Sequence, residues 1–199
     1  MTVSRWMQGA LGVVGLWALV ACGDTSAPAG KPVPELDQAA VRALASERLQ
    51  PFKQQLMQAL QAGMQEGAVH AIDVCRLQAP AIASAASGDG VQIGRTSHRL
   101  RNPANGAEPW QQQVLQAYLA SDQRESVVVD LGNGRAGYAE PIVTAPLCVA
   151  CHGRDIAPEV RAALAQHYPE DQATGFEAGD LRGIFWVTLP VPVSAHSAE

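Results

Sequence analysis

The first part of the chain carries its apolar residues at the spacing of an α-helix. Between residues 35 and 66 they recur every three to five positions, which is the period of one helix face. Gly67 can end this segment, and a second helical pattern covers residues 68–86. Pro51 and Pro80 lie inside the two segments, and proline removes a backbone hydrogen-bond donor. We therefore expect two successive helices, each kinked or divided at its proline.

The rest of the chain has the pattern of a β-sheet with short helices between the strands. Residues 91–96 alternate between apolar and polar side chains, and the sequence Gly132-Asn133-Gly134 is typical of a tight hairpin turn. Tight hairpins connect antiparallel strands, so the sequence predicts an α+β fold with N-terminal helices packed on an antiparallel sheet. The predicted strands are residues 91–96, 126–131, 135–144 and 183–191, and the predicted short helices are residues 110–121 and 158–166.

Residues 1–21 have the features of an export signal. Arg5 supplies a positive charge, and the apolar run at residues 10–21 is too short to span a bilayer comfortably. The run ends in Leu-Val-Ala followed by Cys22, and small residues before a cysteine are typical of bacterial lipoproteins. We expect Cys22 to be acylated after cleavage, which would anchor the protein to a membrane on its periplasmic side. An ordinary signal peptide that carries a cysteine is the alternative.

The remaining sequence predicts one domain on a flexible tether. Residues 22–34 are rich in Ala, Pro, Ser and Gly and have no apolar periodicity. Residues 35–199 have the size of a single domain with its own core. The formal net charge is −5, and no basic stretch is present to neutralise phosphates. These features argue against nucleic acid as a partner.

The most specific chemical signal is the sequence CVACH at residues 148–152. Two cysteines three positions apart, followed by histidine, form the attachment motif of a c-type haem. The thiols of Cys148 and Cys151 can each add to one haem vinyl group, and His152 can then reach the iron. A thioredoxin-like redox pair and half of a zinc site are the alternatives. The adjoining histidine favours one covalently attached haem, on a loop that leads into the helix at residues 158–166.

Haem iron has a second axial position, and the residues alone leave its occupant open. Cys75 is the only cysteine without an assigned role, and an odd thiol in an oxidising compartment needs a purpose or protection. On a predicted helix it shares a side with Ile72 and Ala79, where an inert core residue is the common case. We expect Met57 and Met64 to fill the core. The candidates are His70, Cys75, His98 (expected on the surface), His167, His196, Met57, Met64, or no ligand.

Several short segments spread over most of the chain form a specific combination. They are residues 71–83 (AIDVCRLQAPAIA), 93–97, 100–103, 148–153, 168–169, Asp171, 173–175 and 179–183 (GDLRG). In this combination the chain resembles the Tll-type family of bacterial c-type haem proteins, which have a PAS-like fold and His/Cys axial ligation. The resemblance implies that the haem lies against the antiparallel sheet and that Cys75 ligates the iron opposite His152. Some members of this family act as sensor domains.

Three arginines that are close in the sequence are candidates for binding the haem propionates. Arg95, Arg99 and Arg101 lie near one another, and a guanidinium group matches the geometry of a carboxylate. We assign this role to Arg95 and Arg101. A solvated loop with Arg99 and Arg101 exposed is the alternative.

These features predict a lipid-anchored haem protein that transfers single electrons at low potential and has no enzymatic activity. A thiolate ligand such as Cys75 favours ferric iron and so lowers the potential. The alternative is a redox or gas sensor, in which Cys75 leaves the reduced iron and opens a site for CO or NO. Either function needs a separate redox or signalling protein as its partner. A peroxidase would need an open iron face, which Cys75 would block.

Overall fold

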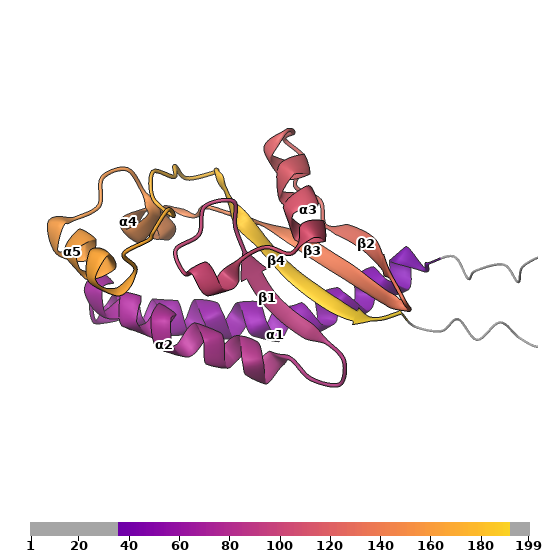
Figure 1. Cartoon of the computed structure of the whole chain (residues 1–199). Coiled ribbons are helices and arrows are strands. Elements are labelled where there is room, and N and C mark those ends of the chain that lie inside the picture. The colour runs from indigo at the N-terminus through magenta and orange to yellow at the C-terminus, as the bar shows by residue number, and fades with distance from the viewer. Residues whose placement is uncertain (1–35, 192–199) are drawn as a thin grey trace, which may run out of the picture. The chain divides into compact units, whose positions relative to one another are not determined.

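The computed structural model describes residues 36–191, which form helices and one four-stranded sheet (Figure 1). The two long helices come first, and the shorter helices alternate with the strands, as the sequence pattern predicts. The elements are α1 (Gln38–Gln65), α2 (Ala68–Ala86), β1 (Gln92–Thr96), the 3-10 helix η1 (Pro103–Asn105), α3 (Pro109–Leu119), β2 (Val127–Gly132), β3 (Arg135–Val143), the 3-10 helix η2 (Pro146–Cys148), α4 (Val149–His152), α5 (Pro158–His167) and β4 (Leu181–Pro190).

The sheet has the strand order β1-β4-β3-β2, and every neighbouring pair is antiparallel. The β2–β3 hairpin turns at Asn133 and Gly134, whose positive φ angles of 52° and 70° suit a tight hairpin. The last strand, β4, lies inside the sheet between β1 and β3. The predicted α+β class with an antiparallel sheet is therefore confirmed.

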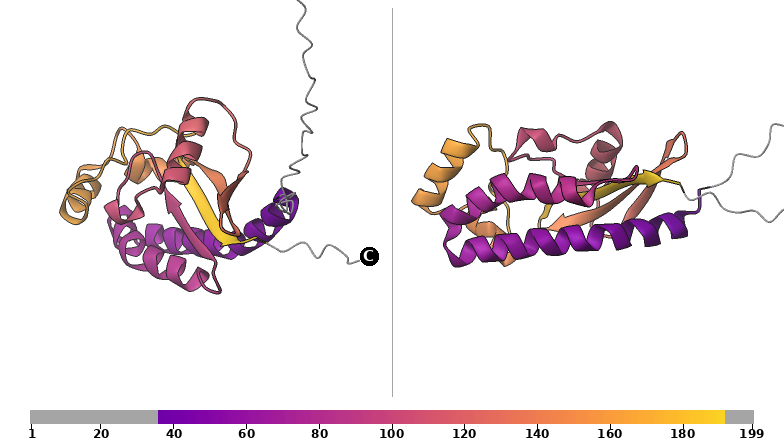
Figure 2. Two further views of the ribbon diagram at one scale, coloured as in Figure 1. Left: turned by 45° about the vertical axis from the view of Figure 1, so that its right-hand side comes forward. Right: turned by 90° about the horizontal axis from the view of Figure 1, so that it is seen from below.

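Helices cover both faces of the sheet (Figures 1 and 2). On one face, Leu49 and Phe52 of α1 pack with Val187 of β4 in a buried cluster. On the other face, α3 packs through Trp110 against Ile184 of β4. Because side chains alternate along a strand, β4 contributes to both cores. Helices α1 and α2 lie side by side on the first face, as the right-hand view of Figure 2 shows.

The expected breaks at the two prolines do not occur. Helix α1 runs unbroken through Pro51, and α2 runs unbroken through Pro80. Both prolines are exposed, whereas Phe52 and Ala79 beside them are buried. Each helix loses one backbone hydrogen bond at its proline, but the packing of the neighbouring side chains holds the helix together.

The segment that carries CVACH is helical, not a loop as predicted. Cys148 ends the 3-10 helix η2, and the other four residues form the single turn of α4. The helix predicted after the motif is confirmed as α5. It packs against α2 through Val160 and Leu164, which contact Ile72. This contact brings the motif close to α2, although the two segments are far apart in the sequence.

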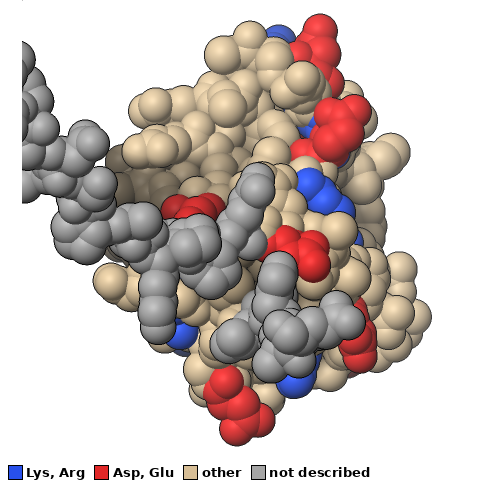
Figure 3. Space-filling view, turned by 90° about the vertical axis from the view of Figure 1, so that its right-hand side faces the viewer, with Lys and Arg blue, Asp and Glu red and all other residues tan. Residues whose placement is uncertain are grey.

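Several sequence predictions fall outside residues 36–191. These are the export signal, the tether, acylation of Cys22 and any role of His196. Within the part that the structure describes, no helix is both long enough and apolar enough to cross a membrane. On the face shown in Figure 3, acidic and basic side chains are interspersed where the surface is not covered.

Candidate functional site

One cavity of about 440 Å³ is lined by the residues that the sequence predicts to bind a haem. Its wall is formed by α1, α2, the β1 strand, the loop after β1 and the CVACH segment. Cys75 contributes from α2, whereas Cys148, Cys151 and His152 contribute from η2 and α4. Arg95 and Arg101 line the same cavity. Residues from opposite halves of the chain therefore meet at one site.

The rest of the cavity wall is largely apolar. Phe185 and Trp186 line it from β4, and Met57 and Met64 line it from α1. Met57 is 45% exposed, so the expectation that it fills the core is wrong. An apolar wall with a few convergent polar groups is typical of a site for a small organic ligand or cofactor. The other apolar lining residues include Leu56, Leu60, Ile72, Ala79, Ile93, Leu100, Ile142 and Leu147.

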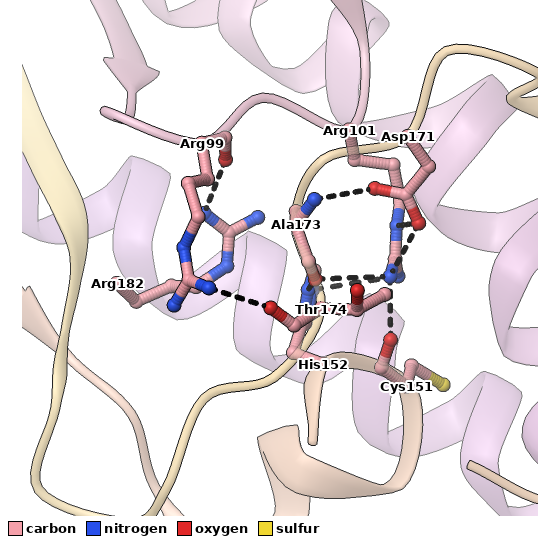
Figure 4. A network of polar contacts seen from close by, with 8 residues as sticks. All are labelled: Arg99, Arg101, Cys151, His152, Asp171, Ala173, Thr174 and Arg182. Carbon is pink, nitrogen blue, oxygen red and sulfur yellow. Dashed lines mark hydrogen bonds and ion pairs between the residues drawn. The ribbon is translucent and has the colours of Figure 1, made fainter. Parts of the chain in front are cut away.

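His152 is held in position by the segment that precedes β4 (Figure 4). Its ring Nδ1 lies 2.6 Å from the carbonyl oxygen of Ala173, and its own carbonyl accepts a hydrogen bond from the Phe176 N–H at 2.9 Å. A second backbone bond joins the Gly175 N–H to the Gly153 carbonyl at 2.8 Å. Because a carbonyl only accepts, Nδ1 carries the proton and Nε2 carries the lone pair, which faces the Nη1 group of Arg101 at 3.5 Å. This is the tautomer that can bind a metal through Nε2.

The surroundings of His152 keep its imidazole neutral. Burial is the main cause, followed by the positive charges of Arg182 and Arg101, and together they lower the pKa of His152 to about 2. The buried Phe176 ring also meets the imidazole edge to face, with 6.4 Å between ring centroids. A neutral imidazole with a fixed tautomer is the form of histidine that ligates metals.

Arg101 forms a buried ion pair with Asp171, and their side chains are only 12% and 9% exposed. The Nη2 group of Arg101 lies 3.0 Å from the Asp171 carboxylate and donates to the carbonyls of Cys151 and Ala173. The other Asp171 oxygen accepts from the Ala173 N–H at 2.8 Å. These bonds connect the CVACH segment to the carbonyl that orients His152. The alternative of an exposed, solvated Arg101 is therefore wrong.

The thiols of the motif lack the features of a thiol–disulfide redox site. Burial raises the pKa of Cys151, although Arg101 opposes this effect, whereas a reactive thiol needs a lowered pKa. Helix α4 has only four residues, so its dipole is weak. Among residues 36–191, no three His, Cys, Asp or Glu side chains are placed to hold a bare metal ion. This geometry disfavours both the thioredoxin-like pair and the zinc site.

The other histidines of the described chain lie away from the cavity wall. His70 is 47% exposed and lies 3.6 Å from Glu66, and His167 lies 3.7 Å from Asp73. His98 was expected on the surface, but it is half-buried against the ring of Phe176. Burial, with Arg99 and Arg182 nearby, lowers the pKa of His98. The apolar contact with a residue far along the chain explains why the local polar sequence was misleading.

Arg182 is the site residue that reasoning from the sequence missed. It is half-buried at the start of β4 and lines the cavity. Its Nη1 donates to the Ser97 hydroxyl at 2.9 Å. The same Nη1 donates to the Arg99 carbonyl at 3.3 Å (Figure 4). Arg99 itself does not line the cavity: it stacks on the ring of Phe176 and donates to the Thr174 carbonyl at 2.8 Å. The signal in the sequence was the GDLRG segment, whose arginine had no assigned role.

Comparisons with known proteins agree with this architecture. A search of curated proteins finds no match. The crystal structure of the cyanobacterial heme-protein Tll0287 is similar, with a TM-score of 0.57 and 24% sequence identity over 76% of this chain and 95% of that one. The sequence profile of the Tll0287-like family matches residues 36–190. The chain belongs to the Tll0287-like family.

Proposed function

We propose that this protein binds one haem covalently in the cavity and uses it to transfer single electrons. The observation that carries the proposal is the shared cavity of the C-x-x-C-H motif and Cys75, with apolar walls between them. Two thiols, an oriented neutral imidazole, a third thiol and nearby arginines fit the groups of a haem. The relative Tll0287 is described as a heme-protein, which supports the same cofactor here.

The cysteines and the histidine of the cavity each have a role in this proposal. Cys148 and Cys151 would hold the haem through thioether bonds, and His152 would ligate its iron through Nε2. Cys75 would supply the second axial ligand from α2. When bound, the haem supplies one-electron redox chemistry at its iron. The polypeptide orients the His152 imidazole, and largely apolar side chains line the rest of the cavity.

The two residues that would ligate the iron differ in how the protein supports them. His152 is held by its hydrogen bond to Ala173 and by the packing of Phe176. Cys75 is a free thiol within residues 36–191, and no hydrogen bond to its sulfur is present there. An anionic sulfur donor favours the ferric state, and we therefore expect a low reduction potential.

The unsupported thiol also favours a second candidate function, which is redox or gas sensing. If reduction weakens the bond to Cys75, the free thiol takes up a proton and leaves one axial position open. A small ligand such as CO or NO could then bind there. This sensor would need a signalling protein as its partner, just as electron transfer needs a redox partner.

We also propose that the protein is a lipoprotein of the periplasmic side of a membrane. Acylation of Cys22 would leave residues 22–34 as a tether between the membrane and the domain. Labelling cells with a radioactive fatty acid tests this. Label is expected on the wild type and absent from Cys22→Ala, and equal labelling of both proteins would refute the anchor.

The haem proposal is tested by the mass and the absorption spectra of the purified full chain. Wild type is expected to carry one haem that survives denaturation, with a low-spin ferric spectrum. Cys75→Ala is expected to keep the covalent haem and lose the thiolate signature. The matched control is Met64→Leu, which changes another residue of the cavity wall and should leave the spectrum unchanged.

The outcomes separate the parts of the proposal. A colourless wild type with the mass of its polypeptide and lipid alone refutes haem binding. An unchanged spectrum in Cys75→Ala refutes ligation by Cys75. Reduced wild type that binds CO favours sensing, whereas reduced wild type that stays six-coordinate under CO favours electron transfer.

A further inference from the structure

Two of the arginines on the cavity wall have no acidic partner within residues 36–191. Arg182 and Arg95 both line the cavity, and neither forms an ion pair with any carboxylate among residues 36–191. Arg182 uses only Nη1 for hydrogen bonds within this part of the chain, and both acceptors are neutral oxygens. Its remaining donors have no protein acceptor among the described residues. A half-buried guanidinium with free donors beside a cavity points to a ligand that carries negative charge.

The guanidinium groups of two neighbouring arginines are engaged by other parts of the protein. Arg101 is neutralised by Asp171 and donates to two carbonyls. Arg99 lies flat on Phe176, with its guanidinium carbon 3.7 Å from the ring centroid, and does not reach the cavity wall. This division revises the expectation from the sequence, in which Arg101 was one of two residues assigned to the propionates.

We propose that Arg182, together with Arg95, forms a carboxylate-binding subsite of the cavity, and that this subsite takes the propionate groups of the haem. The inference rests on the proposed haem binding and adds the residues that recognise the charged edge of that ligand. A guanidinium can donate two parallel hydrogen bonds to one carboxylate, which suits the free donors of Arg182. Arg101 has a different role, which is to position the motif through Asp171.

The electrostatics of the site favour an anionic ligand. Burial, with Arg101 and Arg95 as the next causes, lowers the pKa of Arg182 to about 10. Three cationic side chains therefore repel one another around the cavity. Within residues 36–191, the Asp171 carboxylate opposes this repulsion from its ion pair with Arg101. Carboxylates placed beside Arg182 would relieve this repulsion and replace the water that a buried charge loses.

The test follows the propionates directly in the purified holoprotein. Resonance Raman spectra report the propionate bending mode, and the reduction potential changes with pH where a propionate titrates. A guanidinium next to a carboxylate lowers its pKa by roughly 1–3 units. In Arg182→Gln we therefore expect the bending mode to shift and the pH range of the potential change to move up by a similar amount. The mass should still show covalent haem, because Cys148 and Cys151 are intact.

Two further variants make the test decisive. Arg182→Lys keeps the charge and protects the fold but cannot donate in a bidentate manner, so we expect the same changes at smaller size. Arg48→Gln is the matched control, because Arg48 is exposed on α1 and does not line the cavity. Wild-type spectra and titrations in both Arg182 variants would overturn the subsite while leaving haem binding intact. A wild type without covalent haem would overturn both.

Discussion

Replacing Asp171 with asparagine isolates the charge of the buried ion pair that supports the His152 side of the cavity. The asparagine side chain has nearly the same shape, and its oxygen can still accept the hydrogen bond of the Ala173 N–H, which lies 2.8 Å from Asp171 in the structure. What disappears is the negative charge 3.0 Å from the guanidinium of Arg101. The variant thus leaves a buried cation without its counterion.

The expected size of the effect follows from the burial of the pair. The side chains of Arg101 and Asp171 are 12% and 9% exposed. Removing one partner of a buried pair costs about 3–5 kcal/mol, because the other charge stays in a poorly solvated place. With a urea m-value of about 2 kcal/mol/M, the unfolding midpoint should fall by roughly 1.5–2.5 M.

An exposed ion pair in the same region of the chain provides the control. Arg154 and Glu177 also form an ion pair with a 3.0 Å separation, but they are 70% and 60% exposed. Exposed pairs contribute about 0–1 kcal/mol, so Glu177→Gln should shift the urea midpoint by less than about 0.5 M. Urea unfolding of the full chain, followed by circular dichroism, measures both variants under one condition.

Absorption spectra of the same variants test whether the Asp171 charge also affects His152. The segment at residues 171–173 also presents the carbonyl that fixes the His152 tautomer. In Asp171→Asn we therefore expect a weaker axial bond from His152 and a partial change toward high-spin absorption, which Glu177→Gln should not show. Equal shifts of the urea midpoint in the two variants would refute the reasoning that burial determines how much each ion pair contributes to the unfolding free energy.

Two further predictions concern packing and pH. Gly183→Ala should lower the unfolding free energy by about 1–3 kcal/mol, because its added Cβ would clash with the backbone carbonyl of Thr96. The control is Gly106→Ala, whose Cβ meets only ordinary contacts. Equal urea midpoints in the two variants would contradict the prediction. Because burial lowers the pKa of His98 below 6.5, its contribution to stability is complete above pH 6.5 and declines as the pH falls, since the unfolded chain then binds a proton that the folded chain resists. Unfolding midpoints between pH 5 and 7 should therefore depend less on pH in His98→Phe than in wild type, and an equal dependence in both proteins would contradict the prediction.

The elements of the fold are largely visible in the sequence because they depend on local periodicity. The helical spacing before Gly67 and the alternation after Val91 predict α1 and β1 within a few residues. The breaks expected at Pro51 and Pro80 are absent, since the packing of buried neighbours compensates for one lost hydrogen bond in each helix. The position of β4 between β1 and β3 is not visible in the sequence, because pairing between distant strands leaves no periodic signal.

The candidate site likewise has a local part that the sequence predicts and a distant part that it does not. The CVACH motif is local, so its chemistry can be predicted from five residues. Its supports come from far along the chain: Asp171 pairs with Arg101, and Phe176 packs against His98 and His152. Without the fold, an arginine in a strand, such as Arg182, looks like a solvent-exposed side chain. Closeness in the sequence suggested Arg95 and Arg101 for the propionates, whereas the structure pairs Arg101 with Asp171 and adds Arg182 to the cavity wall.

The two sides of the cavity hold their residues through different numbers of contacts, and under the proposed haem ligation this difference indicates which ligand would be exchanged. On one side, His152 is fixed by its ring hydrogen bond, by backbone bonds to the segment before β4 and by Phe176. On the other side, Cys75 depends on the packing of α2, mainly through Ile72 against α5. A ligand held by several independent contacts moves little, whereas a thiol without hydrogen bonds can rotate at small cost. If ligation changes with redox state, the change should therefore occur at Cys75, and a reduced protein that loses His152 instead would contradict this account of the site.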